Sequence, residues 1–237
     1  MDAVTITVSG NAMLPHPAER ALLEVFVSTE GSTEQSVTEK VTSTAGQVQE
    51  ALRALSPTDE TEEAKAAAAI SHWSMKSLRT SSFVPYDSDG RQQTRRYTAR
   101  ADFEIRFRDF NVLGPFSTQL AAMPHVQMNG VQWILTDATK HALQSELRKM
   151  AARDALVRAR DYAEALGLGN VRLLELSEGA VSSLVSGAQT GLFRSQQPPQ
   201  MQLAAGFGAP SNDRSELSFQ AEEVQATAQV SAKFSAS

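Results

Sequence analysis

The chain has 237 residues, and its 22 Lys and Arg against 27 Asp and Glu give a formal net charge of −5 at pH 7. With 41% hydrophobic and 21% charged residues, this is the composition of a folded globular protein, which excludes wholesale disorder. No apolar run approaches the roughly 20 residues of a membrane span, and a sequence pI near 5.5 gives no general attraction to nucleic acid, so we expect neither membrane nor nucleic acid as a partner.

Two strands and a helix are predicted at the N-terminus. Alternating apolar residues predict one strand that starts at Val4 and ends at Gly10-Asn11, and a second that contains Leu23, Val25 and Val27. We expect these two strands to form a hairpin. Ser32-Thr33-Glu34-Gln35 has the spacing of a capping box, and apolar residues then recur at helical spacing, which predicts a helix over about 33–55.

A second hairpin is predicted in the middle of the chain. Residues 60–69 are acidic and then alanine-rich, and their pattern leaves open a short helical turn or a surface loop. A strand over about 70–82 follows, and Tyr86-Asp87-Ser88-Asp89-Gly90 is typical of a turn because Asp-Gly tolerates positive φ. In the return strand, Phe103, Ile105 and Phe107 share one face and charged residues the other, which predicts one face on a core and one in water.

The C-terminal half is predicted to contain two helices and three strands. Asp109 can cap a short helix over about 111–122, and a strand follows over about 126–135. A long helix over about 138–166 ends at Gly167. Its apolar stripe contains small residues that would let the helix lie close to a sheet; the predicted members are Ala152, Ala155, Leu156, Ala159, Tyr162, Ala163 and Leu166.

The remaining segments are a short strand over about 171–176, a loop and a last strand. Residues 180–215 are rich in Gln, Ser, Gly and Pro, which predicts a long mobile loop. Strict alternation over 222–234 predicts a strand that lies inside a sheet instead of trailing as a tail. We expect the two ends of the chain to be neighbouring strands in one layer, packed against the helix over 138–166. The order β-β-α-β-β-α-β-α-β-β, with hairpins at both ends, predicts a single α+β domain over 1–237, with a mostly antiparallel sheet and helices packed on one face.

The chain offers no marked catalytic, cofactor-binding or metal residues. There is no cysteine, and the four histidines, at 16, 72, 125 and 141, do not have the spacing of metal ligands. No nucleophile elbow and no phosphate-binding loop occurs, so we expect no cofactor and favour a protein that is not an enzyme. A pocket that gathered Trp73, Trp133, a histidine and a buried carboxylate would favour a small-ligand binder or an enzyme instead.

One basic cluster is a candidate contact surface. Tyr86, Arg91, Arg95, Arg96 and Tyr97 surround the tip of the central hairpin, and Arg100 lies close by. They form a candidate site for an acidic protein partner, and the alternative is that they only protect an exposed strand edge. The N-terminus has acidic Asp2 where a secretory signal carries positive charge, which together with the lack of cysteine predicts a cytoplasmic or nucleocytoplasmic protein.

Four segments in order along the chain carry a resemblance to a known family. They are ITVSGNA at Ile6–Ala12, GVQWILTD at Gly130–Asp137, the helix segments ARDA and ARDYAEALG that end at Gly167, and EEVQATAQV at Glu222–Val230. Together they resemble the SIMPL domain family, a domain of unknown function, over about residues 4–234. The resemblance implies no catalytic residues, because none is established for the family.

The resemblance also implies a function class. Members include bacterial periplasmic proteins linked to oxidative stress, a periplasmic protein that forms a ring-like homo-oligomer, and an animal protein that binds a signalling kinase. We therefore expect a non-catalytic homo-oligomer that acts as an interaction or stress-related scaffold. The alternatives are a monomeric adaptor that binds a signalling protein through the 180–215 loop or the basic hairpin, and a small-ligand binder or enzyme.

Overall fold

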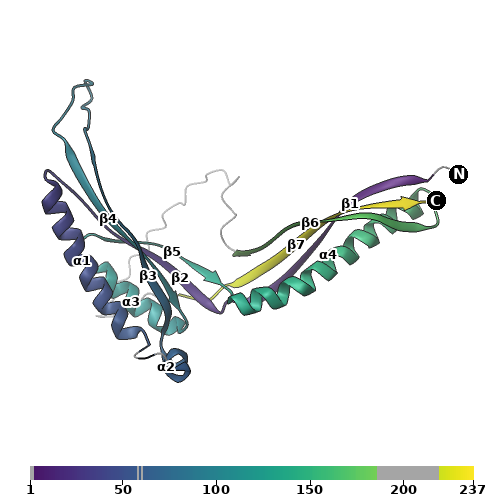
Figure 1. Cartoon of the computed structure of the whole chain (residues 1–237), viewed down its shortest axis with the longest axis horizontal. Coiled ribbons are helices and arrows are strands. Elements are labelled where there is room, and N and C mark those ends of the chain that lie inside the picture. Colours follow the sequence, from purple (N-terminus) through teal and green to yellow (C-terminus); the bar gives the residue numbers. More distant parts are fainter. Residues whose placement is uncertain (1–2, 58, 60, 186–218) are drawn as a thin grey trace, which may run out of the picture. The chain divides into compact units, whose positions relative to one another are not determined.

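The computed structural model of the chain describes residues 3–57, 59, 61–185 and 219–237 (Figure 1). The described residues fall into two compact units. The terminal unit contains residues 3–21, 132–185 and 221–237, and the central unit contains residues 22–131. The two units are distinguished by the contacts within each of them, which does not show that either unit folds independently. A single domain over 1–237 therefore stays a prediction.

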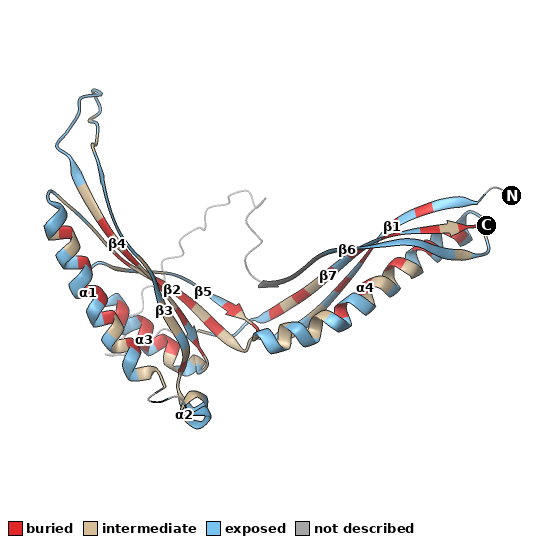
Figure 2. Ribbon diagram, in the orientation of Figure 1, coloured by how far each residue is buried: buried red, intermediate tan, exposed pale blue. Residues whose placement is uncertain are grey.

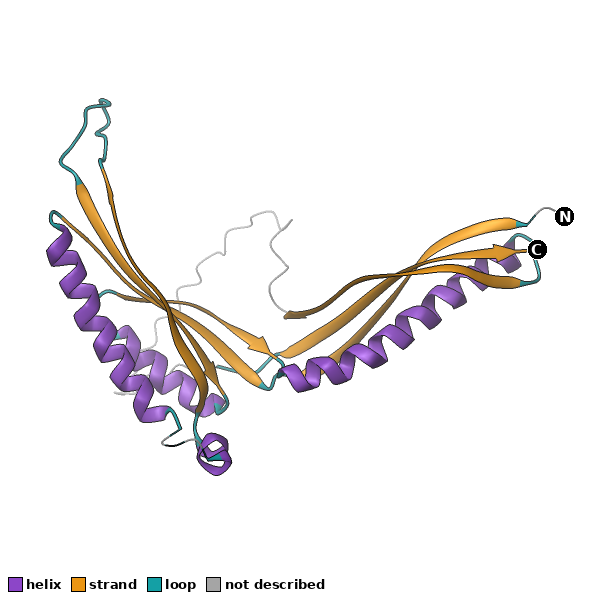
Figure 3. Ribbon diagram, viewed as in Figure 1, coloured by secondary structure: helices purple, strands orange, loops and turns teal. Residues whose placement is uncertain are grey.

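The terminal unit is a three-stranded sheet with one long helix. The strand order is β1 (Val4–Pro17), β7 (Glu223–Ala236), β6 (Val171–Val185), and β7 is antiparallel to both neighbours. Helix α4 (Asp137–Ala165) lies along this sheet (Figure 3). The long helix and the last strand are thus confirmed, and the two ends of the chain are neighbours in one sheet.

Helix α4 meets the sheet through a seam of small side chains. Its buried residues follow one another at four-residue steps; they are Leu147, Ala151, Ala155, Ala159 and Ala163. They pack against alternate residues of β1 and β7, such as Ile6, Val8, Val230 and Phe234. The predicted stripe is therefore confirmed at three alanines and at Leu156, which is half-buried against the core, whereas Ala152 is only half-buried and Tyr162 and Leu166 are exposed.

Gly10 is the point on β1 where the helix comes closest. A Cβ atom at this position would lie 2.7 Å from the Cβ of Ala155 and would also collide with the carbonyl oxygen of Ala151. Real Cβ atoms do not approach other heavy atoms this closely. Glycine is therefore required here for close approach of two backbones.

The central unit is a four-stranded sheet in the order β3 (Ile70–Phe83), β4 (Arg96–Phe107), β2 (Arg20–Gly31), β5 (Val126–Ile134). The same unit contains helices α1 (Glu34–Leu55) and α3 (Leu113–Ala121), and the short helices α2 (Glu62–Ala67) and η1 (Phe110–Val112). The β3–β4 hairpin is antiparallel, and the predicted apolar face of β4 is buried, with Phe103, Ile105 and Phe107 at most 2% exposed (Figure 2). The α+β class with mostly antiparallel pairing is confirmed.

The predicted N-terminal hairpin is wrong. β1 pairs with β7 in one sheet, whereas β2 lies between β4 and β5 in the other. Alternation specifies which face of a strand is buried, but it does not specify which strand is the neighbour. The backbone N–H of Glu19, between the two strands, donates to the carbonyl oxygen of Ile134 (3.1 Å).

Three local predictions are also corrected or decided. Thr33 is the N-cap residue of α1 but makes no side-chain cap bond, and the amide of Gln35 donates to Glu39, so no capping box forms. Residues 62–67 are helical, which decides between the two alternatives for this segment. Strand β6 continues to Val185, beyond its predicted end, and the rest of the predicted 180–215 loop lies outside the described residues.

A single methyl group at Gly10 tests the close approach. We expect Gly10→Ala to lower the free energy of unfolding by about 3 kcal/mol, because the added Cβ forces α4 away from β1. Gly46→Ala is the matched control: Gly46 is exposed in α1 with open space around its Cβ position, and alanine there should stabilise by about 0.5–1 kcal/mol. Urea unfolding of both variants measures the difference, and equal midpoints for Gly10→Ala and wild type would contradict the packing.

Candidate interaction surfaces

The hairpin tip between β3 and β4 is held by one aspartate. The backbone N–H of Gly90, at φ +76°, donates to the carbonyl oxygen of Asp87 (3.0 Å), and the carboxylate of Asp87 accepts from the backbone N–H groups of Asp89 (3.0 Å) and Arg91 (2.8 Å). The predicted turn is confirmed, and its positive φ falls on the glycine. In Figure 1 this connection projects beyond the ends of the two strands.

Three exposed residues of the basic cluster lie on this tip. Tyr86 is 62% exposed, and its hydroxyl oxygen accepts from the amide of Gln92 (3.1 Å). Arg91 and Arg95 are also exposed, and Arg95 donates a long hydrogen bond to the hydroxyl of Ser82 (3.4 Å). These three predicted contact residues therefore present an aromatic ring and two guanidinium groups on one projecting loop.

The other predicted contact residues belong to strand β4. Arg96 pairs with Glu30 of β2 at 3.2 Å, and Tyr97 is half-buried. The guanidinium of Arg100 lies 4.0 Å from the ring centroid of Phe26. A guanidinium stacked on an aromatic ring is held by cation–π attraction. The cluster predicted from sequence is thus divided between the tip and the sheet.

The water-facing side of β3 and β4 carries a ladder of ion pairs. Asp102 accepts from the hydroxyl of Ser77 (2.8 Å) and pairs with Arg79 (3.1 Å) and Arg100 (2.7 Å). Burial alone would raise the pKa of Asp102, but these hydrogen bonds outweigh it and lower the pKa below its ordinary value.

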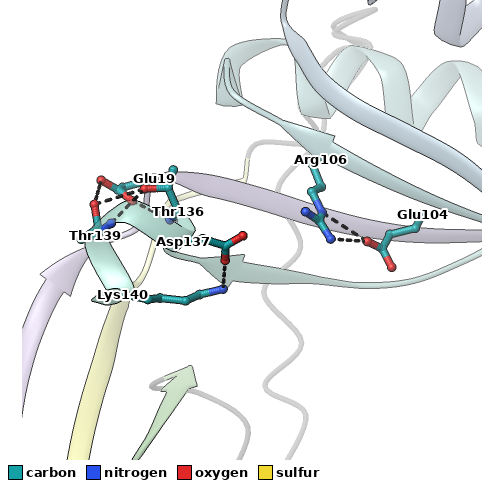
Figure 4. Close-up of polar contacts among 7 residues, drawn as sticks. All are labelled: Glu19, Glu104, Arg106, Thr136, Asp137, Thr139 and Lys140. Carbon is teal, nitrogen blue, oxygen red and sulfur yellow. Dashed lines mark hydrogen bonds and ion pairs between the residues drawn. The ribbon is translucent and has the colours of Figure 1, made fainter. Parts of the chain in front are cut away.

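A second carboxylate continues the ladder. Glu104 pairs with Lys76 of β3 and with Arg106 (3.0 Å; Figure 4). The hydrogen bond from Lys76 is the main cause that lowers the pKa of Glu104, and Glu104 in turn raises the pKa of Lys76. The sequence predicted the charged face of β4 but not these partners, because two irregularities in β3 shift its pairing register with β4.

A shallow cavity of about 290 Å³ lies on this charged face. It is lined by side chains that include Glu24, Phe26, Lys76, Arg100, Asp102 and Asn129. Trp73, Trp133 and the histidines do not line it, so it is not the pocket whose residues would favour a ligand binder or an enzyme. Among its lining charges, Asp102 pairs with Arg79 and Arg100.

The N-terminus of α4 is held by Glu19, which sequence reasoning missed. The carboxylate accepts from the backbone N–H of Thr136 (2.6 Å) and the hydroxyl of Thr139 (2.7 Å; Figure 4). Burial alone would raise the pKa of Glu19, but the hydrogen bonds from Thr136 and Thr139, assisted by His16, lower it. No local pattern marks this contact, because Glu19 and Thr136 are 117 residues apart in the chain.

The described residues contain neither a metal-ligand cluster nor a membrane-spanning helix. No group of three or more His, Cys, Asp or Glu side chains in this part of the chain is placed to hold a metal ion. Among the helices of the same residues, none combines the length and hydropathy of a membrane span.

Comparison with known proteins gives one family. A family model named SIMPL and described as a protein of unknown function (DUF541) matches residues 6–234. Among curated proteins, none matches the chain. The matched residues include α4 and β6 and nearly all of β1 and β7, which are the elements that form the terminal unit.

The hydrogen bonds of Glu19 predict a pH dependence of stability. Because the folded-state pKa is lowered, the unfolded chain protonates first, so this stabilisation is complete above the ordinary glutamate pKa of about 4.3 and is lost as pH falls through the lower folded value. Glu19→Gln should therefore be less stable than wild type at pH 7, with a difference that narrows in acid. Urea unfolding from pH 7 to pH 3 measures this, with exposed Glu50→Gln in α1 as control. A difference that is constant with pH would refute the assignment.

Proposed function

Because the chain belongs to the SIMPL family, whose function is unknown, we propose that it is a non-catalytic protein that self-assembles and serves as an interaction scaffold. The observation that carries the proposal is the apolar surface left on the end strands of both sheets. In the terminal unit, Leu173, Leu174 and Leu176 of β6 are 49%, 58% and 51% exposed. In the central unit, Met75, Leu78 and Phe83 of β3 are 40%, 46% and 45% exposed.

Such strands favour association for two physical reasons. An end strand carries a row of backbone groups that can pair with another strand, and its exposed leucines gain free energy when another surface covers them. Surface leucines that occur singly need no explanation, but three within four residues of one strand form a concentrated apolar patch. This patch supports an interface on the terminal unit.

The hairpin tip supports the scaffold part of the proposal. Tyr86, Arg91 and Arg95 project from the central unit, while the carboxylates of the neighbouring sheet face are already paired with cations. The tip carries two aspartates, Asp87 and Asp89, as well as these arginines, so what it offers to an acidic protein surface is two exposed guanidinium groups and not a net positive charge. A role of this scaffold in a response to stress is part of the same proposal.

A monomeric adaptor is the second candidate, and the exposed arginines of the tip are the observation that favours it. Binding through Arg91 and Arg95 needs no second copy of the chain. The version in which the adaptor binds through the 180–215 loop concerns residues that lie mostly outside the described ones. The two candidates differ in the mass of the protein in solution.

Light scattering on the purified full chain at micromolar concentration tests the proposal. We expect a mass that is a multiple of the 25.6 kDa chain mass. On dilution, this mass should fall only when the protein concentration drops below the dissociation constant of the assembly. A mass of 25.6 kDa over the whole concentration range would overturn self-assembly and favour the monomeric adaptor.

A further inference from the structure

Helix α4 covers only two of the three strands in its sheet. Leu173 and Leu176 of β6 pair in register with Phe234 and Ala232 of β7. Phe234 and Ala232 are 2% and 1% exposed under the helix, whereas the two leucines are 49% and 51% exposed. In Figure 2 the described part of β6 is almost entirely pale blue beside the red bands of β7. Leu173 and Leu176, on the helix-side face of β6, thus form an apolar surface that the described residues leave uncovered, and we call it the β6 flank.

The opposite side of α4 extends over the outer strand β1. The carboxylate of Asp154 accepts from the backbone N–H of Asn11 on β1 (2.8 Å), so this side of the helix faces β1. Arg158, Tyr162 and Leu166 follow Asp154 at four-residue steps and share that side. Tyr162 is 58% and Leu166 is 64% exposed. We call this second apolar surface the α4 flank.

The β6 side of the helix is different. Arg148 pairs with Glu178 of β6 at 2.5 Å, which identifies the side of α4 that faces β6. Residues at four-residue steps from Arg148 continue that side; they are Ala152, Leu156, Arg160 and Glu164. The exposed apolar pair Tyr162 and Leu166 is therefore on the β1 side, away from the bare leucines of its own chain.

Strand β1 has only part of the usual protection of an end strand, in Pro15 and Pro17 near its C-terminal end. Residues 4–17 contain no Asp, Glu, Lys or Arg, and the pairing of β1 with β7 is unbroken over the whole strand. End strands are commonly protected by charges or bulges, and β6 has both, with register shifts at Leu173/Glu175 and Glu178/Val181. A surface that approaches β1 would bury no charged side chain of that strand.

We propose that the β6 flank of one chain binds the α4 flank of a second copy, with Leu173 and Leu176 against Tyr162 and Leu166. The proposal rests on the proposed self-assembly and specifies its interface. β1 and β6 are both antiparallel to β7, so they run parallel to each other. A second copy in the same orientation as the first would therefore bring its β1 parallel to β6. The contact joins two different surfaces and is therefore heterologous, and copies add in one direction.

Because the chain contains no cysteine, any cysteine introduced by substitution is the only thiol that a cross-linker can react with. Leu176→Cys places a thiol on the β6 flank, and Tyr162→Cys places one on the α4 flank. Val157→Cys is the control, because Val157 is 52% exposed and lies two residues after buried Ala155, on the opposite side of the helix. All three positions are exposed in the single chain, so the variants should fold. Full-length variants are treated with a short bifunctional maleimide, singly and as equimolar mixtures.

We expect the mixture of Leu176→Cys and Tyr162→Cys to give several-fold more cross-linked dimer than either variant alone or than Leu176→Cys with Val157→Cys. Equal dimer from one variant alone would show an isologous contact and overturn the proposal. A Leu176→Cys thiol that is shielded from a monofunctional maleimide in dilute, monomeric protein would show cover by its own chain and would also overturn it.

Light scattering on the same samples separates this proposal from the proposed function. A mass above 25.6 kDa without the expected cross-link overturns the interface but leaves self-assembly standing, whereas a monomeric mass overturns both. As a second readout, Leu173→Asp/Leu176→Asp should shift the assembly to lower mass at the same concentration, because each carboxylate would have to be buried in the contact. Val157→Asp should leave the mass unchanged.

Discussion

The terminal unit depends on the close approach of α4 to β1 and β7. At Gly10 a single Cβ atom would collide with the helix, and the helix itself presents alanine at four of its five buried positions. Each alanine buries little apolar area, so the stabilisation comes from the length of the seam and the tight packing that small side chains allow. Because β1 and β7 both lie under this helix, the seam also explains why the two ends of the chain pair along fourteen residues.

The exposed sheet surfaces of the two units differ in chemistry. On the sheet of the central unit, the carboxylates of Asp102 and Glu104 are each held by two cations, so both carboxylates on the water-facing side are fully engaged in ion pairs. On the sheet of the terminal unit, one helix covers two strands and leaves the leucines of β6 uncovered. The described surface thus includes an apolar patch on β6 and exposed arginines on the hairpin tip.

The sequence predicted the elements better than their neighbours. Strict alternation in residues 222–234 and in Phe103, Ile105 and Phe107 specified buried faces correctly, because the period of a strand is a local property. The pairing of β1 with β7 instead of β2 is a property of the whole fold, so alternation could not reveal it. The contact of Glu19 with Thr136 was missed for the same reason, whereas the ion pair of Lys76 with Glu104 was missed because the irregularities in β3 shift its pairing register with β4. Leu173 and Leu176 are exposed because α4 packs on β1 and β7 and does not reach them. No local sequence pattern indicates which strands a helix will cover.

Native-state hydrogen exchange of the amides in β1, β7 and α4 is the most direct test of the central claim. If the seam joins the chain ends into one cooperative unit, the ladder amides of Val224–Phe234 should exchange with the same free energy of opening as the buried stretch Leu147–Ala163 of α4. Gly10→Ala should lower both values together. Rapid exchange throughout β7 while α4 stays protected would contradict the account, because the last strand would then be free of the helix.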